Sequence, residues 1–161
     1  MEKKLVTRCR VLAVVAPATA MLLLCRALWL WAEFEQQLLP YYRAQGIRVM
    51  IEHLTAWQHA AAAIVATTPL LFVCMGLYRA GKVFRLVADG ERIVVGVVRH
   101  LAGIASLILY AALAKIPADA LTSILLTVNN PVGDRSLRLG FSSAELVGIV
   151  AAGFLWAPGS T

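Results

Sequence analysis

Four long apolar runs dominate this sequence and constrain its fold more than any motif does. They cover approximately residues 11–32, 60–78, 95–116 and 139–156. A helix needs about 20 largely apolar residues to cross a hydrocarbon core about 30 Å thick. The sequence therefore predicts an all-α integral membrane protein, a four-helix bundle that forms a single domain over residues 1–161.

Composition supports this class. Hydrophobic residues make up 60% of the chain and charged residues 15%, and the mean hydropathy is +0.76, whereas a soluble domain is about 45–50% apolar. The formal net charge of +6 invites a nucleic-acid partner, but the basic residues are scattered between apolar runs, without a base-stacking platform or a groove-reading helix. We therefore expect the lipid bilayer as a partner and no direct nucleic-acid binding.

The four runs are not equivalent. The first follows a basic start, as a signal peptide does, but the bulky stretch Ala27–Trp31 stands where a cleavage site needs small residues. The third continues past Pro117, which predicts a kink there or a segment lying at the membrane interface. In the fourth, Ser142–Glu145 fits a capping box and leaves only about 14 residues, or ~21 Å, before Pro158. The sequence therefore predicts a short or truncated fourth helix.

The distribution of basic residues predicts the orientation. Nine lie before the first run or in and beside the connection between the second and third runs, and six lie in and beside the alternate connections. The first set is Lys3, Lys4, Arg8, Arg10, Arg79, Lys82, Arg85, Arg92 and Arg99, and the second is Arg26, Arg43, Arg48, Lys115, Arg135 and Arg138. Because connections rich in lysine and arginine stay in the cytoplasm, we expect a cytoplasmic N-terminus and a multi-pass protein of a bacterial inner membrane.

Polar residues within the spans are candidates for function because they are costly in lipid. Thr67 and Thr68 precede a proline in the second run, and Arg99 and His100 begin the third. A polar intramembrane site joining them is one interpretation. The alternative is that the arginine reaches the headgroups and that neighbouring helices satisfy the histidine.

Cofactor and enzyme chemistry are not predicted. His59 and His100 fall near opposite ends of their helices, about 20 Å apart in depth at about 1.5 Å per residue, so they do not form a pair of haem ligands. The three cysteines form no Cys-x-x-Cys pair, which argues against a metal site. Zincin, nucleophile-elbow and phosphate-loop motifs are missing from the sequence. We expect neither cofactor nor metal, and a non-enzymatic protein.

The connection after the second run is the candidate contact surface. The glycine at position 81 is expected to end the second helix, and Val83, Phe84 and Arg85 follow at helical spacing with basic neighbours. Such a segment lies on the inner leaflet or docks a cytoplasmic partner. The candidate contact residues are therefore Gly81, Val83, Phe84 and Arg85.

These residues carry a family resemblance. Gly81–Phe84, Arg99–Gly103, Asn130–Gly133 and Phe141–Leu146 together resemble a family of small bacterial four-helix inner-membrane proteins of unknown function, which have a Gly-x-Ile/Val-Phe motif in the inner loop. Its members are often encoded beside a helix-turn-helix regulator, so the resemblance implies such a transcriptional regulator as a partner. It also implies a charged cytoplasmic tail after the fourth helix, which this chain does not show.

Two functions remain open. The first is a non-enzymatic membrane protein that senses a signal or relays it to a cytoplasmic regulator. The second is a small ligand-binding or transport bundle that uses Arg99, His100, Thr67 and Thr68. In either case the alanine-rich start of the second run, Ala60–Ala63, offers a smooth face on which two protomers could pack, so a homo-oligomer is allowed.

Overall fold

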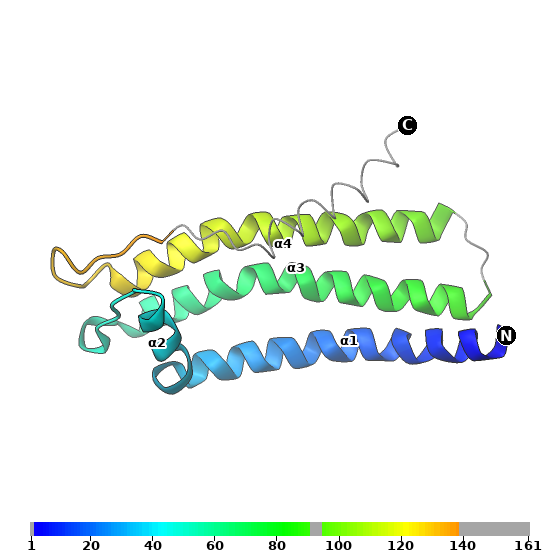
Figure 1. Cartoon of the computed structure of the whole chain (residues 1–161), viewed down its shortest axis with the longest axis horizontal. Helices are drawn as coiled ribbons and strands as arrows, with labels where there is room; N and C mark the ends of the chain where they lie inside the picture. Colours follow the sequence, from blue (N-terminus) through cyan, green and yellow to red (C-terminus); the bar gives the residue numbers. More distant parts are fainter. Residues whose placement is uncertain (1, 91–94, 139–161) are drawn as a thin grey trace.

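The computed structural model describes residues 2–90 and 95–138, and in this part helices are joined by turns and loops (Figure 1). In order these helices are α1 (Glu2–Ala32), α2 (Phe34–Ala44), the short 3₁₀ helix η1 (Ile51–His53), α3 (Ala56–Ala88) and α4 (Val95–Thr127). These residues contain no strand, so the all-α prediction is confirmed. The predicted fourth span, 139–156, lies outside the described residues.

Three of these helices match the first three apolar runs. α1, α3 and α4 are each long and apolar enough to cross a membrane. Their large apolar side chains face outward: Val14, Met21 and Ile64 are each about 70% exposed. Soluble proteins rarely expose contiguous apolar surface on this scale, so this pattern is typical of helices surrounded by lipid.

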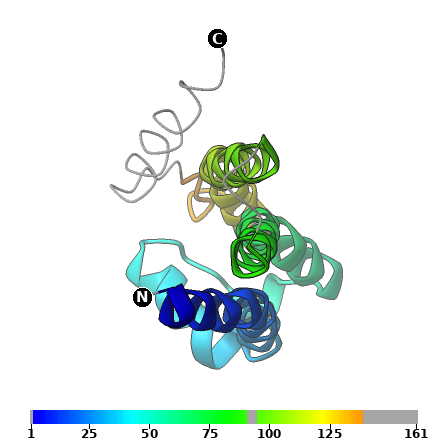
Figure 2. The ribbon, with the colours of Figure 1, turned by 90° about the vertical axis from the view of Figure 1, so that its right-hand side faces the viewer.

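The three long helices lie in a row with α3 in the middle (Figures 1 and 2), and α3 packs against both α1 and α4. Neighbours run in opposite directions. On one side the Cys74 thiol donates a hydrogen bond to the Ala20 carbonyl over 3.4 Å. On the other, the rings of Phe72 and Tyr110 lie 6.2 Å apart. These contacts set the register of each helix pair.

The end of α3 differs from the end predicted for the second membrane helix. The prediction that this helix ends at Gly81 was wrong, because α3 continues to Ala88. Gly81 is a packing residue: a Cβ built on it would lie 3.0 Å from the Pro17 Cδ and 3.1 Å from the Ala13 carbonyl oxygen. The turn comes instead at Gly90, whose φ of +81° is the left-handed conformation that glycine adopts without strain.

Pro117 lies inside α4, which continues to Thr127. The helix is therefore longer than its predicted span, and its last turns join the loops at one end of the row. We call this end, where α1 ends and α3 begins, the cap end. The opposite end, where α1 begins and α3 ends, is the basic end.

The apolar core lies at the cap end. Its buried members come from α1, α2, α3, α4 and the segment between α2 and η1: Trp31, Phe34, Leu39, Ile47, Val49, Ala62 and Leu126. Trp31 and Phe34 stack with ring centroids 5.5 Å apart. This cluster fastens α2 and its neighbouring loops onto the ends of the long helices.

Candidate functional site

Buried polar side chains join the loops of the cap end above the apolar core. Gln58 is 1% exposed, and its Oε1 accepts hydrogen bonds from the Thr55 backbone N–H and hydroxyl and from the Asn129 amide. The Thr-x-x-Gln spacing is that of a capping box. One glutamine thereby closes the start of α3 and ties it to the loop after α4.

Asn130 is the second anchor of this polar cap. It is 2% exposed, and its amide donates to the carbonyls of Arg48, over 2.6 Å, and Asp134, over 3.1 Å. The Arg48 guanidinium also pairs with the Asp134 carboxylate at 3.0 Å. The loop before η1 is thus fixed to the loop after α4.

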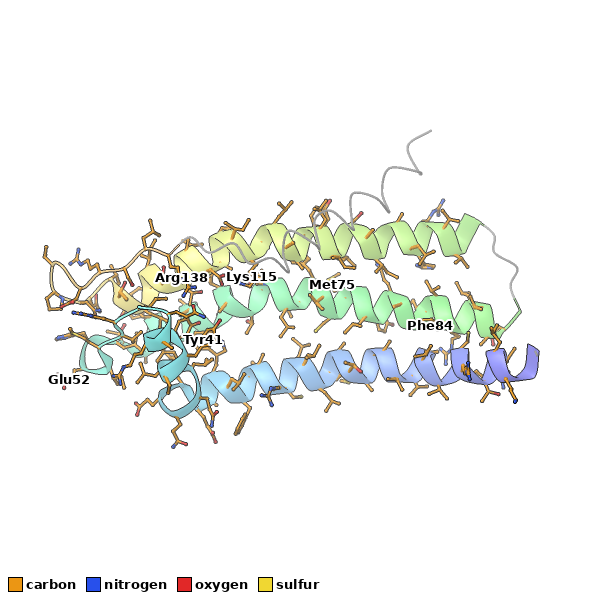
Figure 3. The ribbon with its side chains drawn as sticks, in the orientation of Figure 1. Tyr41, Glu52, Met75, Phe84, Lys115 and Arg138 are labelled. Carbon is orange, nitrogen blue, oxygen red and sulfur yellow. The ribbon has the colours of Figure 1, made fainter. Side chains whose placement is uncertain are left out.

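Arg138 extends the cap. Its backbone N–H donates to the Ser123 hydroxyl over 3.1 Å, and its guanidinium donates to the side chain and the carbonyl of Gln45. Figure 3 shows Arg138, Tyr41 and Glu52 gathered at this end of the row. Three separate segments of the chain therefore meet in one hydrogen-bonded structure.

A pocket of about 470 Å³ opens beside the cap, between the α1–α2 junction and the start of α3. Its lining includes Glu33, Glu35, Thr55 and His59. The His59 Nε2 atom is buried and has no hydrogen-bond partner, while its ring packs edge-on against Phe34 at 5.1 Å. Carboxylates beside an imidazole and an aromatic wall suit a small ligand that carries a positive charge and a hydrogen-bonding group.

Metal chemistry has little support at this end. Among residues 2–90 and 95–138, histidine, cysteine and acidic side chains form no group that could hold a metal ion.

Tyr42 lies in surroundings of low polarity at the cap end. Burial raises the pKa of its phenol well above the usual value, and the Asp119 carboxylate and Tyr41 raise this pKa further. A buried phenol near a carboxylate resists ionisation because both conditions disfavour its charged form. Tyr42 therefore stays neutral well into alkaline solution.

The predicted intramembrane residues lie in two separate places. The Thr67 and Thr68 hydroxyls donate to the carbonyls of Ala63 and Ile64 in their own helix. The α3–α4 register places His100 near the level of Lys82, about 22 Å along α3 from Thr67 at about 1.5 Å per residue. The structure therefore does not bring the threonines together with Arg99 and His100, and none of these four residues lines the pocket beside the cap.

The four predicted contact residues divide into buried and accessible ones. Gly81 is buried against α1, and Val83 is 8% exposed. Phe84 is half-buried, and Arg85 is exposed. Their role in partner contact stays a prediction, but only Phe84 and Arg85 offer side chains at the surface.

Charge separates the two ends of the row. Seven basic residues with described side chains lie at the basic end, and the acidic Asp89 lies beside them. The seven are Lys4, Arg8, Arg10, Arg79, Lys82, Arg85 and Arg99. The cap end mixes both signs, as in the Arg48–Asp134 and Lys115–Asp119 ion pairs. Such an asymmetry has the form that the positive-inside rule requires.

Sequence reasoning missed the polar cap and its pocket. The turn-forming stretch from Asn129 to Asp134 and the Thr-x-x-Gln spacing at Thr55 were signals for its parts. Nothing in the sequence pairs those parts with each other. Comparison with family models, curated proteins and solved structures finds no match for this chain.

Proposed function

We propose that this chain is a non-enzymatic, multi-pass protein of a bacterial inner membrane that senses a signal at its cap end and relays it to a cytoplasmic regulator. Three helices long and apolar enough to cross a membrane support the membrane part of the proposal. The exposed apolar side chains along their middle sections support it further.

The basic end faces the cytoplasm in this proposal, with the N-terminus on the same side. Its lysines and arginines outnumber its acids, whereas the cap end carries paired charges of both signs. Fusing a cytoplasm-dependent reporter after Gly90 should give activity, and fusing it after Gly133 should not. Activity only after Gly133 would reverse the orientation.

One observation supports the proposed relay of a signal across the membrane: α3 is a single helix that extends from the pocket to the candidate contact surface. His59 lines the pocket near its start, and Phe84 and Arg85 lie near its other end. The distance between them is about 38 Å at about 1.5 Å per residue. A helix that also packs against both α1 and α4 can carry a tilt or a shift from one side of the membrane to the other.

The proposed partner is a helix-turn-helix regulator, and the proposed contact centres on Phe84 with Arg85 beside it. A half-buried aromatic next to an exposed arginine is a common anchor at protein interfaces. In this arrangement Gly81 and Val83 hold α3 against its neighbours and keep Phe84 in position. A homo-oligomer remains compatible with the proposal, although Ala62 is already fully buried within one chain.

Replacing Phe84 tests the contact. Membranes carrying the wild-type protein should capture the cognate regulator, Phe84→Asp should abolish capture, and Phe84→Leu should retain most of it. Equal amounts of all three proteins in the membrane serve as the folding control. Capture that survives Phe84→Asp would show that this surface is not the contact.

A further inference from the structure

A second cavity lies on the surface of the row, in the groove between α1 and α3 near the basic end. It measures about 670 Å³. Met21 and Leu24 of α1 and Leu71, Met75 and Tyr78 of α3 supply much of its wall. Met21 is 72% exposed and Met75 52%, so the groove is open along its length and apolar.

The groove ends at two cations. Arg79 and Lys82 line it, and they follow Leu71, Met75 and Tyr78 on one stripe of α3, because residues three, four, seven and eight apart share a helix face. Both are exposed: Lys82 stands over the Tyr78 ring, 4.8 Å from its centroid, and the Arg79 guanidinium reaches toward Gly103 of α4. The apolar section therefore leads directly to two basic side chains.

Further positive charge surrounds this end. Arg85 continues the same stripe of α3, and Arg10 continues the stripe of α1 that includes Pro17 and Leu24. Antiparallel packing, fixed by Gly81 against Pro17, brings these two arginines to the same level. The acid on this part of α3, Asp89, lies beyond Arg85 at the end of the helix.

The dimensions fit one leaflet of a bilayer. From Leu71 to Lys82 the groove runs about 16 Å at about 1.5 Å per residue, which is about half of a hydrocarbon core about 30 Å thick. Arg79 and Lys82 then stand at headgroup level while the apolar wall faces the acyl chains.

We propose that the α1–α3 groove binds an anionic phospholipid, with an acyl chain along Met21, Leu71 and Met75 and the phosphate on Arg79 and Lys82. Charge complementarity favours an anionic phospholipid over a second copy of the chain as the occupant of the groove. A second copy of the chain would bring its own basic residues to the same level and repel these, whereas an anionic headgroup neutralises them. The choice of leaflet rests on the proposed orientation, but the site itself does not.

Equilibrium binding of a fluorescent phosphatidylglycerol to the full chain in neutral detergent micelles tests the site. Wild type should bind it in preference to phosphatidylcholine. Arg79→Gln and Lys82→Gln should each weaken binding about fivefold, since one basic residue near anionic lipid contributes about that factor. Met75→Trp should also weaken binding, because the larger ring fills the groove while every charge remains.

Arg99→Gln is the matched control, because it removes an exposed cation from the same end of the row, on α4, that does not line the groove. It should bind as wild type does. Equal loss in Arg99→Gln would show a diffuse charge effect and overturn the site, as would equal binding of phosphatidylcholine. Dimers that dissociate in Met75→Trp and do not respond to phosphatidylglycerol would assign the groove to a second copy and also overturn it. None of these outcomes depends on capture of the regulator.

Discussion

Two glycines of α3 offer a controlled test of the helix packing. A Cβ on Gly81 would lie 3.0 Å from the Pro17 Cδ and 3.1 Å from the Ala13 carbonyl oxygen, whereas a Cβ on Gly76 would meet only the Leu107 Cβ, at 4.0 Å. The first contact is with a rigid ring and a backbone atom of α1, so neither can rotate away. The second is ordinary van der Waals contact.

The expected magnitude follows from these distances. Forcing an extra methyl group into a packed contact costs about 1–3 kcal/mol, and glycine to alanine in a helix gains about 1 kcal/mol. The gain in helix propensity is the same at both positions, so it cancels when the free energies of unfolding of the two variants are compared. Gly81→Ala should therefore be less stable than Gly76→Ala by about 1–3 kcal/mol.

Reversible unfolding in mixed micelles, with increasing sodium dodecyl sulfate and circular dichroism as the signal, measures this difference. Adding Pro17→Ala to Gly81→Ala should recover part of the loss, because it removes the ring from the contact, and residues in contact show such coupling. Equal free energies of unfolding for Gly76→Ala and Gly81→Ala would refute the α1–α3 register, and the groove between these helices with it.

Two further predictions concern the cap end. Asn130→Ala should lower the free energy of unfolding by about 1–3 kcal/mol, because the part-buried hydrogen bonds from its amide to the carbonyls of Arg48 and Asp134 are lost. Val132→Ala, at a position 93% exposed, should change it little, and equal effects in the same unfolding assay would contradict the cap. The folded state keeps the Tyr42 phenolic proton that the unfolded chain releases near pH 10. The contribution of Tyr42 to the free energy of unfolding is therefore fully present below pH 10 and is lost above it, by up to about 1.4 kcal/mol per pH unit. Unfolding measured from pH 8 to pH 11 should show this loss in wild type and a smaller one in Tyr42→Phe, and parallel curves would refute the assignment.

The helical class and the apolar spans were accessible from sequence because they depend on local composition. Three of the predicted spans fall within α1, α3 and α4, since a long apolar run needs no partner to be recognised. Their ends were less accessible. Gly81 was interpreted as a helix end because glycine commonly follows one, yet the residue that required a left-handed φ was Gly90.

The residues of the candidate sites could also be recognised one by one from the sequence, but their contacts could not. Thr67, Thr68, Arg99 and His100 stand out as polar residues within apolar runs, but whether they share a site depends on the register between α3 and α4. The polar cap was out of reach for the same reason: the Asn130 amide meets the Arg48 carbonyl, and the Asn129 amide meets Gln58, across long separations in the chain. Each of these residues looks ordinary by itself.

The sequence by itself determined that the chain is helical, that it carries spans suited to lipid, and that its positive charge is unevenly distributed, because hydropathy and charge are summed along neighbouring residues. Only the tertiary structure decided that α3 lies between α1 and α4, that Gly81 is a contact with Pro17, and that His59 lines a pocket. These properties depend on which residues of separate helices lie at the same level, and that is set by the packing of small side chains between helices.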